Sequence, residues 1–161
     1  MVLTGARTDD EVSLRLMVES RANAIYHSTK RSLWATRDVT AKIVLAILSA
    51  AASAPLASAH VPSLIGWCGL LSAVLGAFVV ALRMDHKATT HAELATEYIS
   101  HYYVFELMCD SGDFSGLAPA RVAYSETEKR EAKQVGAVDS ECFAVAEARA
   151  KHSETGCTLP E

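Results

Sequence analysis

A long uncharged stretch, Ile43 to Leu82, constrains the fold of this chain more than any other feature. Its forty positions contain no Asp, Glu, Lys or Arg, although the whole chain has only 161 residues. A soluble domain of this size seldom leaves a quarter of its length uncharged, whereas a membrane-crossing helix needs about 20 apolar residues. The sequence HVPS at residues 60–63 divides the stretch. The pattern therefore predicts two transmembrane helices, residues 41–59 and 64–82, joined by a turn at residues 60–63.

Basic residues on both sides of this stretch predict its orientation. The turn carries neither Lys nor Arg, whereas the flanks carry Lys30, Arg31, Arg37, Lys42, Arg83 and Lys87. Because such residues are retained on the cytoplasmic side, both termini are expected in the cytoplasm and the turn outside. The chain as a whole has a formal charge of −4, so no nucleic-acid partner is predicted.

The segments before and after the predicted spans have the pattern of two long helices. In the first, residues 1–42, Thr8 and Glu11 form a capping box, and no Pro or Gly follows before the first span. The second, residues 83–108, carries a seam of alternating three- and four-residue steps. The seam consists of Met84, Lys87, His91, Leu94, Tyr98, His101, Phe105 and Met108.

A hairpin in the membrane would bring these two helices together as an antiparallel cytoplasmic stalk. Counting back from the turn in both directions places His27 beside Tyr98. The same count predicts that Lys30 and Arg31 pair with Glu93 or Glu97. Exposed ion pairs contribute only ~0.2–1 kcal/mol each, so these pairs would determine the register of the stalk more than its stability.

The last third of the chain, residues 109–161, is acidic and is also predicted to be helical. A turn-rich break is expected at Cys109 to Gly116. A second capping box, Ser125 to Glu128, then opens a helix as far as His152, with a split near Gly136. The predicted fold is therefore all-α: a two-helix transmembrane hairpin, continuous with a cytoplasmic antiparallel helical stalk, and a C-terminal helical segment.

Small residues recur at four-residue intervals in both predicted spans. They are Ser49, Ala50, Ser53 and Ala54 in the first span and Gly69, Ser72, Ala73 and Gly76 in the second. Small side chains let helices approach closely, and serine can hydrogen-bond across the contact. Such faces pack the hairpin on itself, drive self-assembly into a homo-oligomer or line a pore, and the sequence leaves these alternatives open. The lack of charge in either span argues against a proton relay or an ion-coupled carrier.

No sequence pattern predicts catalysis, a cofactor or a bound metal. The G-x-S-x-G, P-loop, dinucleotide-binding and H-E-x-x-H motifs are absent. His91 is five residues from His86 and ten from His101, so neither spacing suits one metal ion on a helix. The four cysteines form no C-x-x-C pair and are expected as free thiols. The chain is therefore predicted not to be an enzyme.

Two short elements give the chain a family resemblance. The first helix contains Ala24-Ile25-Tyr26-His27, and the returning helix contains Ala88-Thr89-Thr90-His91-Ala92-Glu93-Leu94-Ala95-Thr96-Glu97-Tyr98. With the two spans between them, they resemble the SLATT family of bacterial two-transmembrane proteins, over Glu11 to Met108. The residues that match its pattern are His91, Ala95 and Tyr98, together with Tyr26 and His27. Arg31 and Glu93 are further candidates in the stalk.

The resemblance implies a function in the bacterial inner membrane. It implies an effector of an antiphage, abortive-infection system that oligomerises when triggered and forms a pore or disrupts the lipid bilayer. It also implies a nucleotide-signalling synthase or a sensor protein as partner, because nothing in this chain resembles either. The alternative is a non-conducting membrane anchor or scaffold that recruits a cytoplasmic partner. A membrane-bound enzyme and a holin-like or immunity protein are further alternatives.

Overall fold

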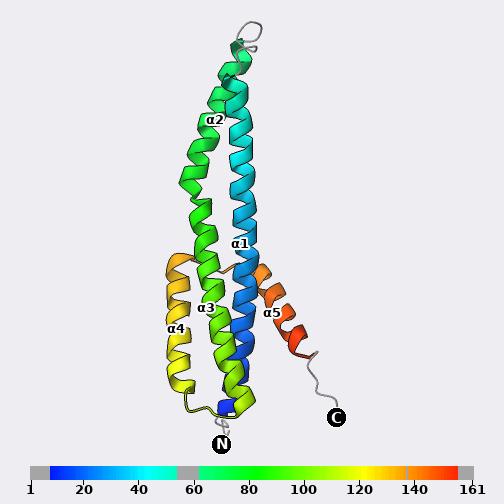
Figure 1. The fold of residues 1–161 in the computed structure, drawn as a ribbon, viewed down its shortest axis with the longest axis vertical. Coiled ribbons are helices and arrows are strands. Elements are labelled where there is room, and N and C mark those ends of the chain that lie inside the picture. Colours follow the sequence, from blue (N-terminus) through cyan, green and yellow to red (C-terminus); the bar gives the residue numbers. More distant parts are fainter. Residues whose placement is uncertain (1–7, 54–61, 137, 156–161) are drawn as a thin grey trace, which may run out of the picture. The chain divides into compact units, whose positions relative to one another are not determined.

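The computed structural model describes residues 8–53, 62–136 and 138–155, and within these ranges it contains helices and no strands. In the described ranges, five helices follow one another (Figure 1). They are α1 (Asp9–Ser53), α2 (Pro62–Leu82), α3 (Met84–Ser111), α4 (Leu117–Gln134) and α5 (Ser140–Thr155). The predicted all-α class is therefore confirmed.

The first helix, α1, runs for 45 residues without a break. It begins after Thr8, whose Oγ1 accepts a hydrogen bond from the backbone N–H of Glu11 at 3.3 Å. Asp9, Asp10 and Glu11 place negative charge in the first turn, where it interacts favourably with the helix dipole. The predicted N-cap is thus confirmed. The helix also continues past residue 42, where the sequence predicts that a cytoplasmic segment meets the first span.

A residue with left-handed backbone geometry flanks α3 at each end. Arg83, between α2 and α3, has a φ of 45°, a conformation that costs a residue with a Cβ atom roughly 1–2 kcal/mol. Gly112, just after α3, has a φ of 66°, which glycine adopts without that cost. Because α3 extends to Ser111, the predicted break at Cys109 to Gly116 is shortened to residues 112–116.

The last two helices differ in their boundaries from the sequence prediction. The predicted capping box at Ser125 to Glu128 is wrong, because α4 already begins at Leu117 and contains it. Pro119 lies in the first turn of α4, where a missing N–H disrupts no helical hydrogen bond. The predicted split is confirmed: Gly136 has a φ of 80°, and Asp139 Oδ1 accepts a hydrogen bond from the Cys142 N–H at 3.2 Å to cap α5.

The chain divides into two compact units, and α1 and α3 each contribute to both. The first unit, Met1–Lys30 with Thr90–Glu161, is called the polar-core unit below. Its buried apolar cluster comes from α1, α3 and α4 and consists of Ala24, Leu94, Tyr98, Phe105, Leu117 and Tyr124. On α3 the buried residues include His91, Leu94, Tyr98 and Phe105, so this part of the predicted seam is confirmed.

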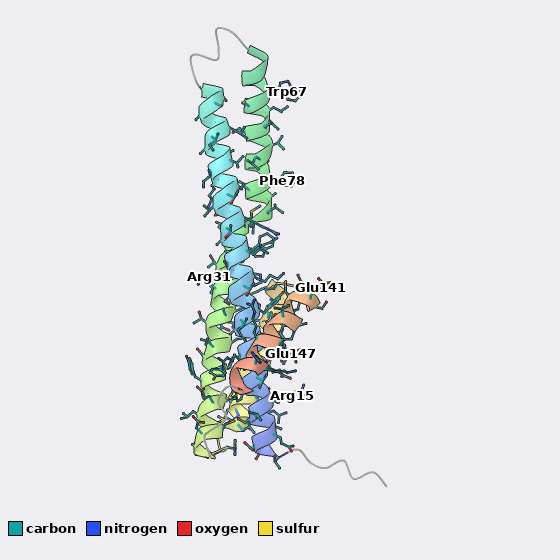
Figure 2. All side chains as sticks on the ribbon, turned by 90° about the vertical axis from the view of Figure 1, so that its right-hand side faces the viewer. Arg15, Arg31, Trp67, Phe78, Glu141 and Glu147 are labelled. Atoms are coloured by element: carbon teal, nitrogen blue, oxygen red, sulfur yellow. The ribbon has the colours of Figure 1, made fainter. Side chains whose placement is uncertain are left out.

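The second unit, Arg31–Thr89, is called the apolar unit below, and it exposes its large apolar side chains. Trp67, Phe78 and Val80 on α2 are 64%, 61% and 76% exposed. Figure 2 shows Trp67 and Phe78 pointing away from α1. A water-soluble helix pair would turn such side chains inward, because burying them is the main driving force for folding in water.

One helical stretch among the described residues, Gly66–Ser111, is long and apolar enough to cross a membrane, judged by length and composition. None of its apolar segment is buried. Residues 66–82 of the second predicted span, 64–82, fall in this stretch. The first, residues 41–59, is described only as far as Ser53, and residues 60–61 of the predicted turn lie outside the described ranges. The two-span hairpin therefore stays a prediction.

Candidate functional site

A cluster of four titratable side chains from three helices lies in the interior of the polar-core unit. His27 comes from α1, His91 and Tyr98 from α3, and Glu131 from α4. His27 and Tyr98 are fully buried, and His91 and Glu131 are only 5% and 6% exposed. Buried polar groups are costly unless they are paired, so these four must satisfy one another.

The four side chains form a continuous network. Nδ1 of His27 lies 2.8 Å from Nδ1 of His91, so one ring donates a proton and the other accepts it. On the other side of the His27 ring, its Nε2 lies 3.2 Å from Oε1 of Glu131. The hydroxyl of Tyr98 donates a hydrogen bond to Oε2 of Glu131 at 2.5 Å, and its ring stacks on His27 with centroids 5.5 Å apart. Each group thus restrains the next.

Burial and neighbouring charges determine the protonation of the network. Burial lowers the pKa of His91 to about 4, with contributions from the charges of His27 and Lys30, so this ring is neutral at pH 7. Burial alone would raise the pKa of Glu131, but the adjacent His27 and the Tyr98 hydroxyl lower it further than burial raises it. Burial and Glu131 raise the pKa of Tyr98. The stable arrangement is therefore a carboxylate that faces a phenol donor and an imidazole.

A second group of contacts holds the segment between α4 and α5 against α1. Lys30 Nζ lies 2.7 Å from Asp139 Oδ2, and this contact lowers the pKa of Asp139 to about 2. The hydroxyl of Tyr26 accepts a hydrogen bond from the Asp139 N–H at 3.2 Å. The Tyr26 ring makes edge contacts with His27 and with Phe143 of α5. Tyr26 therefore connects the buried network to α5.

The predicted register pairs are wrong. Lys30 pairs with Asp139, and Glu97 pairs with Arg130 of α4. Sequence counting considered only the two stalk helices, whereas α4 and the segment after it supply the charged partners. Arg31 and Glu93 are exposed, in the apolar and the polar-core unit respectively.

Of the residues that match the family pattern, four come together and one does not. Tyr26, His27, His91 and Tyr98 share the buried cluster, and the predicted approach of His27 to Tyr98 is confirmed by their stacked rings. Ala95 is half-buried on α3 and takes no part in the network. Glu131 is the member that sequence reasoning missed. The spacing of Tyr124, Thr127 and Glu131, all buried on α4, was the available signal.

The small residues of the apolar unit divide into a contact face and an exposed face. Ser49 Oγ and Ser72 Oγ lie 2.9 Å apart, and a Cβ placed on Gly76 would meet Leu45 at 3.9 Å. Gly69 has no atom that close, and Ala50 and Ala73 are exposed. The Ser53 side chain and Ala54 lie outside the described residues.

A groove lies between α1, α4 and α5 of the polar-core unit. Its volume is about 520 Å³, and its walls carry four carboxylates (Glu19, Glu128, Glu131 and Glu147) and one guanidinium, Arg15. Figure 2 shows Arg15 on α1 and Glu147 on α5. Within the described ranges, no group of three or more His, Cys, Asp or Glu has the arrangement of a metal site. The groove therefore concentrates negative charge without the geometry of a metal site.

No protein-family model, curated protein or solved structure matches this chain. The resemblance to the SLATT family accordingly rests on the two sequence elements and the layout of the chain.

Proposed function

We propose that this protein is a membrane effector that self-assembles in a lipid bilayer and makes the bilayer permeable. The observation that carries the proposal is that the apolar unit exposes large apolar side chains and places small and polar residues at its helix contact. Its large side chains, such as Ile47, Phe78 and Val80, are more than half exposed, while serine and glycine lie at the contact between α1 and α2. This distribution suits a surface in contact with lipid, where close packing of small residues holds helices together.

The same unit contains a basic and aromatic cluster that suits a membrane–water interface. Two cations lie over the ring of Trp34, with Arg37 Cζ 5.2 Å and Lys87 Nζ 4.5 Å from its centroid. Lys42 pairs with Asp38 at 2.6 Å. Tryptophan and basic side chains concentrate at the cytoplasmic interface of membrane proteins. We therefore propose two spans with both termini in the cytoplasm and the turn at residues 60–63 outside.

Helical continuity supports a route from a cytoplasmic signal to the bilayer. α1 and α3 each belong to both units, with the divisions after Lys30 and Thr89 inside unbroken helices. A rotation of either helix in the polar-core unit would therefore enter the apolar unit through the backbone. In this proposal the protein acts in bacterial antiphage defence, and a nucleotide-signalling synthase or a sensor protein supplies the trigger. The exposed residues Ala50 and Ala73 are the candidates for contacts between copies.

Dye release from liposomes tests this proposal. The purified chain is reconstituted at increasing protein-to-lipid ratios, and release should rise more steeply than in proportion to protein, as expected for an oligomer. Ala73→Leu should reduce release severalfold, because the added bulk prevents close helix approach. Val74→Leu is the matched control, since Val74 is already large and 50% exposed. Absence of release from the wild-type chain at every ratio, with and without the cognate trigger, would contradict permeabilisation.

A non-conducting scaffold is the second candidate. It is favoured by an exposed stripe on α3 of the polar-core unit, where Ile99, Tyr103 and Leu107 are 43%, 59% and 69% exposed at four-residue intervals. Such a stripe can bind the apolar face of a partner helix. A scaffold would release no dye under any trigger. It would also lose its soluble partner in a pull-down when Tyr103 and Leu107 are replaced by Ser.

A further inference from the structure

A groove at the junction of α2 and α3 combines basic side chains with an apolar wall. It lies entirely in the apolar unit, has a volume of about 440 Å³, and is lined by residues of α1, α2, α3 and the junction itself. Lys42 and Arg83 supply its cations, and Val79 and Val80 supply its apolar wall. A molecule in this groove would therefore meet positive charge and a hydrocarbon surface together.

Cations exceed carboxylates around this groove. The apolar unit holds five Lys or Arg residues and two Asp residues, although the whole chain has a formal charge of −4. One of the two carboxylates, Asp38, is only 8% exposed, and its Oδ2 lies 2.6 Å from Lys42 Nζ. The other is Asp85, which also lines the groove. Three exposed cations of the unit form no ion pair among the described residues, namely Arg37, Arg83 and Lys87.

The apolar wall of the groove continues into the exposed surface of the predicted spans. Val80, one turn before Arg83, is 76% exposed, and Phe78 is 61% exposed and points away from α1 (Figure 2). On α1, Ile43 follows Lys42 directly and is 55% exposed. On both helices a cation thus adjoins an exposed apolar face. A phospholipid presents the complementary order of groups, a charged phosphate followed by acyl chains.

An indole ring lies beside the basic groove. Arg37 and Lys87 lie over the ring of Trp34, and Trp34 precedes the lining residue Asp38 by one turn of α1. The carbonyl of Arg83 accepts a hydrogen bond from the Lys87 N–H at 3.0 Å, so one helical turn separates these two cations. Tryptophan rings favour the depth of lipid headgroups in a bilayer. The ring therefore provides a local probe of what the groove binds.

We propose that this groove binds the headgroup of an anionic phospholipid. The phosphate lies between Lys42 and Arg83, which donate charge-assisted hydrogen bonds to its oxygens, and the acyl chains follow the exposed face of α2. A zwitterionic lipid offers the same phosphate but adds a cation, which the surplus positive charge of the unit disfavours. The inference rests on the proposed location of this unit in a bilayer, and it adds the class of lipid that the unit selects.

Lipid titration in micelles tests this inference. Dioctanoyl phosphatidylglycerol, dioctanoyl phosphatidylcholine or inorganic phosphate is added to the full chain in a nonionic detergent, and the indole N–H shift of Trp34 is followed by NMR. Half-saturation should require at least ~5-fold less of the anionic lipid than of the zwitterionic one, and the difference should shrink as salt is added. Trp67, near the start of α2, should not distinguish the two lipids. An equal response of Trp34 to inorganic phosphate would overturn the lipid assignment.

Substitutions separate the groove from general attraction to a charged micelle. Arg83→Gln should raise the half-saturation point of the anionic lipid by roughly three- to tenfold, whereas Arg83→Lys keeps the charge and should change it less than ~twofold. Arg149→Gln removes the same charge from an exposed position on α5 and should also change it less than ~twofold.

Equal half-saturation for the two lipids, or equal effects of Arg83→Gln and Arg149→Gln, would overturn the inference. Dye release from liposomes of phosphatidylcholine alone tests permeabilisation without an anionic lipid. Release without lipid selectivity would contradict only the inference, and selectivity without release would contradict only the proposed function.

Discussion

The two units of this protein bury opposite kinds of side chain between their helices. The polar-core unit buries histidine, tyrosine and glutamate side chains and connects them by hydrogen bonds. The apolar unit exposes its large hydrophobic side chains and places serine and glycine at the contact between helices. α1 and α3 contribute to both units, so the kind of side chain that each of them buries changes along its length. The difference shows that helices of one chain can pack on buried polar and aromatic side chains in one unit and on small residues in the other.

The largest expected effect comes from truncating the same residue type in each unit. Phe105 is fully buried in the polar-core unit, whereas Phe78 in the apolar unit is 61% exposed. Phe105→Ala should lower the free energy of unfolding by about 3–5 kcal/mol, because it removes buried contacts and leaves a cavity. Phe78→Ala should lower it by less than ~1 kcal/mol in detergent, since detergent replaces the lost contacts. Thermal unfolding of the full chain, followed by near-UV circular dichroism, measures both.

Similar losses for the two phenylalanine variants would break the comparison. That result would mean that Phe78 is buried against protein, for instance between copies of the chain. Repeating the measurement at several protein concentrations separates these cases, because only contacts between copies depend on concentration.

The next effect concerns pH and the buried histidine pair. The folded-state pKa of His91 is about 4, below the ordinary value of 6.5, so the unfolded chain binds more protons between these values. The free energy of unfolding should therefore fall as the pH falls from about 6.5 towards 4, by on the order of 3 kcal/mol in total. The titratable groups that face His91 are His27 and Lys30 from α1 and Glu131 from α4. Urea unfolding between pH 7 and pH 5 measures the slope.

Two variants test whether His91 causes this pH dependence of the free energy of unfolding. His91→Gln should reduce the slope, while His152→Gln, at an exposed position on α5, should leave it unchanged. Burial also lowers the pKa of His101, so a smaller slope of the same sign should persist in His91→Gln. The lowered pKa of Glu131 affects stability mainly below its ordinary value of 4.5, outside the measured range of pH 7 to pH 5. An unchanged slope in His91→Gln would show that another group is responsible.

A third effect isolates one hydrogen bond of the network. Tyr98→Phe removes the hydroxyl that donates to Glu131 at 2.5 Å and keeps the ring that stacks on His27. Loss of a buried hydrogen bond to a charged group should cost about 1.5–3 kcal/mol of unfolding free energy. Tyr103→Phe, at a position that is 59% exposed, should cost less than ~0.5 kcal/mol. Chemical denaturation at pH 7 compares the two, and equal losses would rule out a special contribution from the network.

Periodicity along α3 made half of this network predictable. The seam of three- and four-residue steps correctly indicated that His91, Leu94, Tyr98 and Phe105 face inward. Antiparallel counting correctly brought His27 to Tyr98. Both inferences concern two neighbouring helices whose register follows from chain length, so local pattern and geometry were sufficient.

The contribution of α4 could not be predicted in the same way. Glu131 lies 33 residues beyond Tyr98, after a break whose geometry determines where the next helix returns. The apparent capping box at Ser125 placed the predicted start of α4 eight residues too late, whereas Gly116 precedes the helix and Pro119 lies in its first turn. Without the first two turns of α4, the spacing of Tyr124, Thr127 and Glu131 does not stand out. The charged partners of Lys30 and Glu97 were missed for the same reason.

The smallest expected effect comes from the hydrogen bond of the apolar unit. Ser49 and Ser72 face each other with oxygens 2.9 Å apart, and hydrogen bonds between membrane helices average only about 0.6 kcal/mol in coupling energy. Ser49→Ala, Ser72→Ala and the double variant should therefore give a coupling of ~0.5–1 kcal/mol in a double-mutant cycle of unfolding in detergent. A cycle of Ser49→Ala with Thr89→Ala, whose hydroxyl bonds to the carbonyl of Asp85 in its own helix, should give none. A Ser49–Ser72 coupling as large as the loss in Tyr98→Phe would show that both units are held by polar contacts. The contrast between them would then lie only in which surface faces outward.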